Sequence, residues 1–166
     1  MTARTLLLAA LCGSAELGTA DAQATPAPKE PVTVWGSLST EFFILPSLSA
    51  GVSVGVGQAG PASLSVRGMA DLTYVPLPDV TTPLLPLIGA DLLFSGLVGN
   101  LTVYGGPGVG TLLGQAFWVS GTAGLRNTFG NSRWGFFSEV RGRYAFDLAG
   151  NGFLSPGTRL GLTYRF

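Results

Sequence analysis

The chain has 166 residues, of which 46% are hydrophobic and only 11% are charged, and its nine basic residues balance nine acidic ones. This length corresponds to about one domain, and the low charge argues against a disordered chain or a typical cytosolic enzyme. A net charge of zero argues against a nucleic-acid partner, which requires a basic face. The chain has no histidine, the usual general base and commonest metal ligand. We therefore expect no enzyme activity, no cofactor and no metal site.

Residues 1–24 have the features of a cleavable signal peptide. Arg4 supplies a positive charge near the start, and residues 5–11 form an apolar stretch too short to span a bilayer as a helix. Residues 22–24, Ala-Gln-Ala, match a small-x-small cleavage site. The only cysteine, Cys12, lies in this segment. Cleavage would therefore leave a mature chain without disulfides or cysteine-based sites.

Residues 25–31 contain three prolines, and we predict a short extended linker there. Residues 32–166 form the single predicted domain. Within it, residues 92–125 carry no charge, which could suggest a membrane helix. However, this stretch contains nine glycines and Pro107. Each glycine costs a helix about 1 kcal/mol and a proline about 3 kcal/mol relative to alanine, so a helix here is strongly disfavoured.

Apolar and polar residues alternate with a period of two along the domain, as is typical of β-strands. In residues 62–74, for example, Val66 and Leu72 share the apolar face while Arg67 lies on the polar face. Turns rich in Gly, Pro, Asn and Asp separate the alternating segments. We therefore predict an all-β fold with eight strands. The predicted strands span residues 32–44, 48–57, 62–74, 86–94, 101–111, 117–126, 134–146 and 158–166.

The orientation of the two faces separates two classes of barrel. A soluble barrel encloses its apolar face, whereas a membrane barrel turns that face outward to lipid. Every charge in the predicted strands lies on a polar face among Gly, Ser and Thr, which suits the narrow interior of an eight-stranded barrel. The predicted lumen charges are Glu41, Arg67, Asp71, Asp91, Arg126, Glu139, Arg141, Arg143, Arg159 and Arg165.

Strand length and aromatic residues also bear on this choice. About ten residues at about 3.3 Å each, tilted by about 40°, cover about 25 Å, which is the height of the apolar band of a membrane barrel. Aromatic residues on the apolar faces lie near predicted strand ends, where interfacial girdles form, although aromatics are common in any sheet. These residues are Tyr74, Phe94, Phe117, Trp134, Phe146, Tyr164 and Phe166. We therefore predict an antiparallel up-and-down transmembrane β-barrel.

The last predicted strand places Leu160, Leu162, Tyr164 and Phe166 on one face and ends on an aromatic residue. It resembles the carboxy-terminal signature of bacterial outer-membrane barrels, which the barrel-assembly machinery recognises. The glycine-rich segment 103–110 is similar to a strand of small barrels of the OmpA/OmpX-like kind. The resemblance implies a bacterial outer-membrane location, with outer-membrane lipid and the assembly machinery as partners.

If the amino terminus of the barrel starts in the periplasm, the connections divide into outer loops and periplasmic turns. The two longest connections then fall on the outer side, as expected for such barrels. The predicted outer loops are 45–47, 75–86, 112–116 and 147–155, and the predicted turns are 58–61, 95–100 and 127–133.

The enclosed charges allow two interpretations. They can plug the lumen with ion pairs, because buried charges must be paired. They can also line a narrow pore, which the excess of six arginines over four acids would bias toward anions. We predict the plug, and with it a structural role in the cell envelope or an interaction with other envelope proteins. A narrow anion-leaning channel and a secreted soluble ligand-binding barrel stay open as alternatives.

Two further features of the sequence bear on nucleotide binding and on enzyme activity. Residues 55–60 match G-x-G-x-x-G, but a strand follows where a dinucleotide site needs a helix. Outer-membrane enzymes that edit lipid A use a catalytic histidine, and this chain has none.

Overall fold

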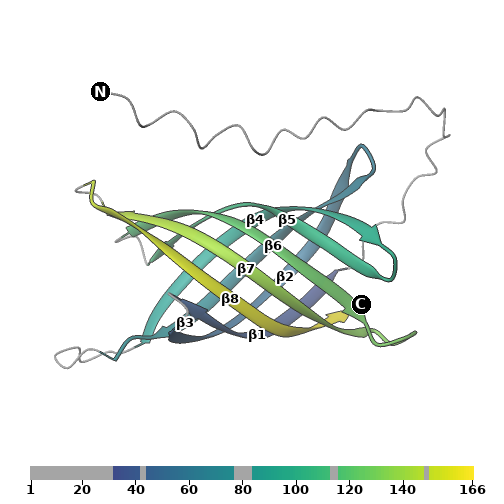
Figure 1. The fold of residues 1–166 in the computed structure, drawn as a ribbon, viewed down its shortest axis with the longest axis horizontal. Helices are drawn as coiled ribbons and strands as arrows, with labels where there is room; N and C mark the ends of the chain where they lie inside the picture. The colour runs from purple at the N-terminus through teal and green to yellow at the C-terminus, as the bar shows by residue number, and fades with distance from the viewer. Residues whose placement is uncertain (1–31, 42–43, 77–83, 113–115, 148–149) are drawn as a thin grey trace.

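The computed structural model describes residues 32–41, 44–76, 84–112, 116–147 and 150–166. Across them, eight antiparallel strands pair in sequential order, and β1 pairs with both β2 and β8 to close a barrel (Figure 1). The predicted eight-stranded, all-β antiparallel barrel is confirmed. The predicted signal peptide and linker lie outside the described residues. The strands are β1 (Thr33–Glu41), β2 (Leu45–Ala59), β3 (Ala62–Tyr74), β4 (Leu84–Val98), β5 (Leu101–Leu112), β6 (Ala116–Thr128), β7 (Trp134–Asp147) and β8 (Gly152–Arg165).

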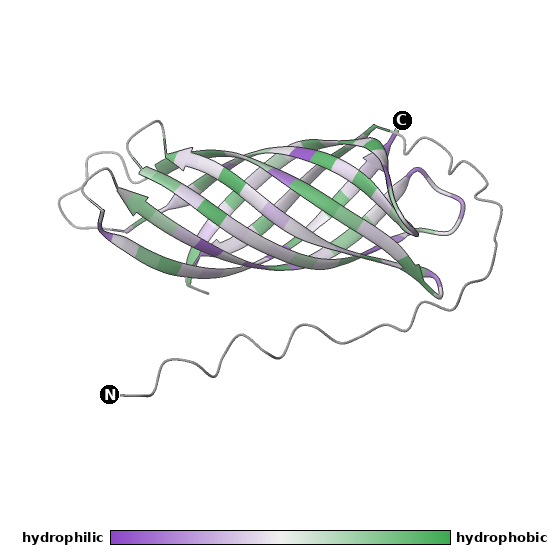
Figure 2. Ribbon diagram, turned by 90° about the horizontal axis from the view of Figure 1, so that it is seen from above, coloured by the Kyte–Doolittle hydropathy of each residue, from purple (hydrophilic) through white to green (hydrophobic). Residues whose placement is uncertain are grey.

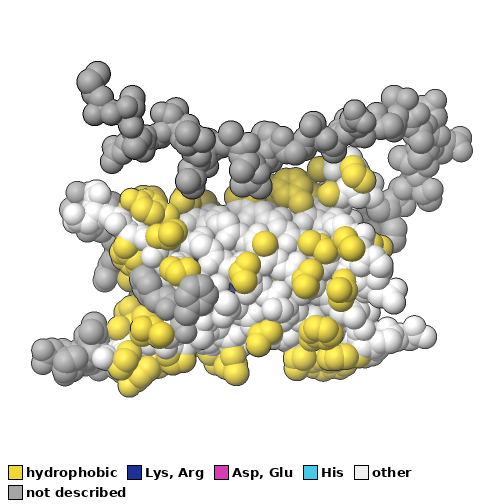
Figure 3. Space-filling model, in the orientation of Figure 1, with side chains coloured by type: hydrophobic (Ala, Val, Ile, Leu, Met, Phe, Trp, Pro, Cys, Tyr) yellow, Lys and Arg dark blue, Asp and Glu magenta, His cyan; other side chains and the backbone are white. Residues whose placement is uncertain are grey.

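The barrel wall has apolar side chains outside and mostly polar side chains inside, where Trp35, Met69 and Phe137 form a small apolar cluster. On β7, Val140 is 59% exposed, whereas its neighbours Glu139 and Arg141 are 2% and 5% exposed. Figure 2 shows this alternation along the strands, and the face drawn in Figure 3 carries hydrophobic side chains without a charged patch. This polarity is the reverse of that of a soluble barrel, whose apolar residues fill the interior.

Several strands extend further than the sequence pattern predicts. β2 begins at Leu45, so Pro46 and Ser47, which we expected to break the chain, belong to a strand. β8 begins at Gly152, although we predicted a loop through Ser155. Most connections between the strands are correspondingly shorter than expected. The first strand, which we expected to reach Ile44, ends at Glu41, so the connection between β1 and β2 keeps its expected length and lies earlier in the chain.

The prolines inside these extensions lie where the strand is paired on one side only. Pro46 pairs with β1, but the described pairing of β2 with β3 starts at Ser47. Pro156 pairs with β7, and the described pairing of β8 with β1 starts at Gly157. Because proline has no N–H to donate, a strand tolerates it where one edge has no partner.

The two ends of the barrel differ in their connections. The tight turns 60–61, 99–100 and 129–133 lie at one end, which we call the turn end and which also holds the start of β1 and the end of β8. Gly60 and Gly99 adopt φ of 61° there, in the left-handed region that favours glycine. The opposite end, where β1 leads to β2 and β3 leads to β4, is called the loop end. The connections are grouped at the two ends as predicted, and which end faces the periplasm stays a prediction.

Candidate functional site

The strand period brings charged side chains from distant parts of the chain into the lumen. Arg67 and Asp71 share the inner face of β3, and Glu139, Arg141 and Arg143 share the inner face of β7. β3 and β7 are not neighbours in the barrel, because β3 pairs with β2 and β4 whereas β7 pairs with β6 and β8. Ion pairs between these two strands therefore cross the lumen.

Arg67 lies between two carboxylates toward the turn end. Its Nε and Nη2 donate to Oδ2 of Asp91 at 2.9 and 2.5 Å, and its Nη1 donates to Oε2 of Glu139 at 2.5 Å. The hydroxyl of Tyr104 donates to the same oxygen of Glu139 at 3.2 Å. Arg67 thus joins the neighbouring strand β4 to β7 across the barrel.

A second group toward the loop end alternates two arginines with two acids. Arg141 donates to Glu41 Oε1 at 2.5 Å and to Asp71 Oδ2 at 3.4 Å. Arg143 donates to Glu41 Oε1 at 2.9 Å and also to Asp71 Oδ2. Ser155 donates its hydroxyl to the other oxygen of Glu41 at 3.0 Å. Each carboxylate in this group therefore contacts two guanidinium groups.

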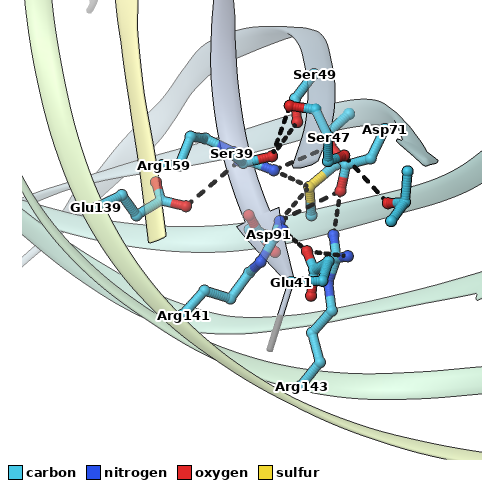
Figure 4. Close-up of polar contacts among 12 residues, drawn as sticks. Ser39, Glu41, Ser47, Ser49, Asp71, Asp91, Glu139, Arg141, Arg143 and Arg159 are labelled. Atoms are coloured by element: carbon cyan, nitrogen blue, oxygen red, sulfur yellow. Dashed lines mark hydrogen bonds and ion pairs between the residues drawn. The ribbon is translucent and has the colours of Figure 1, made fainter. Parts of the chain in front are cut away.

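Arg159 of β8 connects the two groups. Its Nη1 lies 3.3 Å from Oε1 of Glu139, and its Nη2 lies 3.0 Å from Oδ1 of Asp71 (Figure 4). The side chain is almost fully buried, with 1% of the residue exposed. One continuous network of alternating charge, here called the lumen network, results. It consists of Glu41, Arg67, Asp71, Asp91, Glu139, Arg141, Arg143 and Arg159.

The lumen network contains four arginines and four acids and is therefore neutral. Of the ten predicted lumen charges, only Arg126 and Arg165 are outside it. Both are half-buried toward the turn end, and within the described part of the chain neither forms an ion pair. The arginine excess in the sequence is thus absent from the network itself.

Two tryptophan rings lie against guanidinium groups of the lumen network. The guanidinium carbons of Arg67 and Arg159 lie 5.4 and 4.8 Å from the ring centroid of Trp35, and that of Arg143 lies 4.8 Å from the ring centroid of Trp118. A guanidinium over an aromatic face is attracted by the negative face of the ring, more strongly where water is excluded. The rings therefore stabilise positive charge that burial would otherwise penalise.

Sequence reasoning did not single out Trp35, Tyr104, Trp118 or Ser155 as partners of these charges. The three aromatic residues occupy polar-face positions of their strands, so the alternation itself carried a signal that they point inward. Ser155 carried no such signal, because its neighbours Gly152 and Pro156 are typical of a turn.

The residues of the predicted assembly signal lie at the outer surface of β8. Leu160 and Leu162 are 65% and 51% exposed, and Phe166 is also exposed. Tyr164 contacts the rings of Trp134 and Phe166, with both centroid distances 5.1 Å. They form an apolar stripe that ends in an aromatic cluster at the turn end.

The lumen network leaves little free space around the middle of the barrel. A cavity of about 30 Å³ lies on its turn-end side, lined in part by Arg67, Tyr104 and Arg126. Such a volume admits about two or three water molecules, since each needs about 10–15 Å³. No group of three potential metal ligands occurs in the described ranges. Each acid of the network contacts at least one arginine, so the arrangement is suited to holding strands together.

No protein-family model matches the chain, and comparison with curated proteins and with solved structures gives no match. Among the described residues, no helix is long and apolar enough to cross a membrane.

Proposed function

We propose that the protein is an integral β-barrel of a bacterial outer membrane, exported by a signal peptide and similar in kind to OmpA/OmpX-like barrels. The observation that carries the proposal is the inverted polarity of the wall. Leu38, Val109 and Leu160 expose 71%, 59% and 65% of their surface, whereas the arginines of the lumen network are enclosed. Large exposed apolar surfaces on a monomer mark a contact with lipid or protein, and a continuous apolar belt around a closed barrel fits lipid.

Aromatic clusters at both ends of the wall support the same proposal. Toward the loop end, the rings of Phe117 and Tyr144 lie 6.3 and 6.5 Å from that of Phe146. Toward the turn end, Trp134 contacts Tyr164. Along β7, Trp134 and Tyr144 are about ten residues apart, which corresponds to about 25 Å along the barrel axis at a tilt of about 40°. This separation equals the height of the apolar band expected between interfacial aromatic girdles.

The lumen network favours a sealed barrel over a channel. Its ion pairs cross from β3 to β7, and the cavity on its turn-end side, of about 30 Å³, has little room. The neutral balance of the network also removes the basis for an anion-selective constriction there. We therefore infer a structural role in the envelope, or an interaction with other envelope proteins, with lipid and the assembly machinery as partners.

A soluble ligand-binding barrel fits these observations poorly. It would need an apolar interior and a charged exterior. An anion-leaning channel keeps one specific observation in its favour, since Arg126 and Arg165 lie outside the network near the turn end.

Planar-bilayer recordings test the sealed barrel. The purified protein, inserted at neutral pH and moderate salt, is expected to give no conductance steps. Matched samples run in parallel should show insertion by protease protection of the barrel. Anion-selective steps from inserted protein would overturn the plug and favour the channel.

Fractionation tests the location independently. After expression in a Gram-negative host, the protein is expected to sediment with outer-membrane material on a density gradient and to resist extraction by high salt. Recovery of folded protein in the soluble periplasmic fraction would contradict the proposal.

A further inference from the structure

The lumen changes character between the lumen network and the loop end. There, leucines occupy several inward-facing positions, and together with Thr73 and Ser155 they line a cavity of about 380 Å³. Leu45, Leu85 and Leu87 contribute to its wall together with Val75 and Ala145. The mouth includes the exposed Phe153 and Asn151. A barrel interior that served only to seal would have no need of this apolar section.

The floor of the cavity is closed by residues of the lumen network. Glu41 and Arg143 line it, and both are already paired, with each other and with Arg141 and Asp71 (Figure 4). Trp118 lies beneath the Arg143 guanidinium and also contributes to the lining. Because each of these charges is paired with an opposite charge, the floor calls for no counter-ion. Two of its buried donors, Arg143 Nε and Trp118 Nε1, have no hydrogen-bond partner among the described residues. The cavity is therefore a blind, apolar pocket and not part of a passage.

Its dimensions favour a long, thin occupant. An apolar cavity of about 150 Å³ holds one benzene molecule, so this cavity has more than twice that room. The interior of an eight-stranded barrel is only wide enough for side chains or one small ligand. The lining extends furthest along the chain from Ser155 through Phe153 to Asn151, which is four residue steps, or about 13 Å of extended chain. A single alkyl chain fits this length and volume.

We infer that the cavity binds the alkyl chain of a single-chain amphiphile such as a fatty acid. The chain enters from the loop end with its apolar tip toward Trp118, and the polar head stays at the mouth near Asn151, where water is available. Burying the chain removes its apolar surface and that of the leucine wall from water, which is the dominant favourable term for such pockets. The chain can come from a free fatty acid or from a lipid of the surrounding membrane. The inference goes beyond the proposed function and does not depend on it, because the pocket lies inside the wall.

Short-range nuclear Overhauser contacts can detect the bound chain. The experiment uses deuterated protein with protonated Leu and Ala methyl groups, in nanodiscs of deuterated phospholipid, with protonated dodecanoate as the probe. We expect contacts from the chain to the methyls of Leu85 and Leu87 that saturate at one dodecanoate per barrel. A second sample, with protonated phospholipid and no dodecanoate, reports whether membrane lipid supplies the chain. Contacts in either sample support the inference, and the pair identifies the source.

Two alanine variants make the test specific to the cavity. Ala145→Trp fills the pocket and should abolish the contacts to Leu85 and Leu87, whereas Ala123→Trp adds the same side chain to the outer face and should leave them unchanged. If Ala145→Trp fails to fold, Ala116→Phe narrows the same cavity. Contacts confined to outward methyls in the wild-type barrel would overturn the inference. Loss of the Leu87 contacts in Ala123→Trp as well as in Ala145→Trp would also overturn it.

The same measurement separates this inference from the proposed function. If the protein folds in plain buffer and does not enter nanodiscs, the membrane proposal fails, and the dodecanoate titration is run in buffer. Saturable contacts there would still support the alkyl site, and their absence would overturn it.

Discussion

Arg159 is the residue on which the continuity of the lumen network depends. Among the described residues, it is the only side chain that forms ion pairs with both Glu139 and Asp71, and these acids belong to the turn-end and loop-end groups respectively. Without it, the remaining pairs form two separate groups. A buried carboxylate that loses a cationic partner retains most of its desolvation penalty, so the loss is expected to be large.

Arg159→Gln should lower the free energy of unfolding by about 3–5 kcal/mol, the usual effect of removing one partner from a buried ion pair. Urea titration of the lipid-reconstituted barrel measures it. Arg165→Gln, on the same strand, is the matched control, since Arg165 is half-buried and has no ion pair within the described residues. Its expected effect is below about 0.5 kcal/mol. Equal effects of the two substitutions would show that the network does not stabilise the fold.

Glycines in the lumen make room for the aromatic side chains of the site. A Cβ atom added at Gly124 would lie 2.6 and 2.7 Å from Cζ and the hydroxyl of Tyr104, and 2.8 Å from the carbonyl oxygen of Ser138. At Gly121, on the outer face of the same strand, an added Cβ meets nothing within 4 Å. The high glycine content of the chain therefore has a packing reason at inward positions.

Gly124→Ala should destabilise the barrel by about 1–3 kcal/mol, the usual cost of overpacking a filled interior. Gly121→Ala should be neutral or slightly stabilising, because alanine restricts the unfolded chain without creating a clash. Thermal unfolding of the two variants, followed by circular dichroism, measures the difference. A Gly124→Ala barrel as stable as the Gly121→Ala barrel would mean that the Tyr104 ring moves freely.

At the scale of the strand, the alternation of side chains predicted where strands lie. The strand ends were predicted less well, because they depend on pairing with neighbouring strands. β3 was predicted with the observed bounds because its alternation from Ala62 to Tyr74 is interrupted only at Gly68 and Met69. β8 was predicted six residues too short at its start, since Pro156 and the nearby glycines are typical of a turn. Whether a proline ends a strand depends on the register of both neighbours, which a single sequence does not contain.

The candidate site was predicted from the sequence to a similar extent. Period-two spacing was sufficient to place the acids and arginines on the inner face, because side chains two apart point to the same side. Which arginine pairs with which acid depends on contacts across the lumen, such as Arg67 with Glu139, and no local pattern encodes these. The mixed character of the lumen, polar in the middle and apolar at the loop end, was also missed. Leu87 and Leu93 merely blurred the alternation, although both point inward.

The free-energy cost of an outward-facing charge should depend on its position along the strand, and this can be tested. Val140→Arg places a charge on the outer face in the middle of β7, whereas Val98→Arg places it at the turn end of β4. In a lipid-spanning wall, arginine costs about 2–4 kcal/mol at the midplane and about 0–1 kcal/mol near the interface. We therefore expect Val140→Arg to impair folding into vesicles and Val98→Arg to be tolerated. Equal tolerance of both charges would argue that the wall faces water.

At the scale of the whole molecule, a closed ladder of eight strands satisfies its own backbone hydrogen bonds. A structure without open edges can lie in hydrocarbon, where unpaired N–H and C=O groups would cost several kcal/mol each. The charged side chains of the lumen network point inward and are paired there, so the outer face of the barrel is an apolar belt. The closed fold, the paired charges and the apolar outer surface are therefore all consistent with a lipid bilayer.

Folding of the urea-unfolded chain on dilution, with and without phospholipid vesicles, tests this account most directly. Gel mobility of unheated against boiled samples reports the compact barrel, and circular dichroism reports β-structure. The account predicts a faster-migrating, heat-sensitive band and strand signal only when vesicles are present, with aggregation in their absence. A folded, monomeric barrel in lipid-free and detergent-free buffer would contradict it.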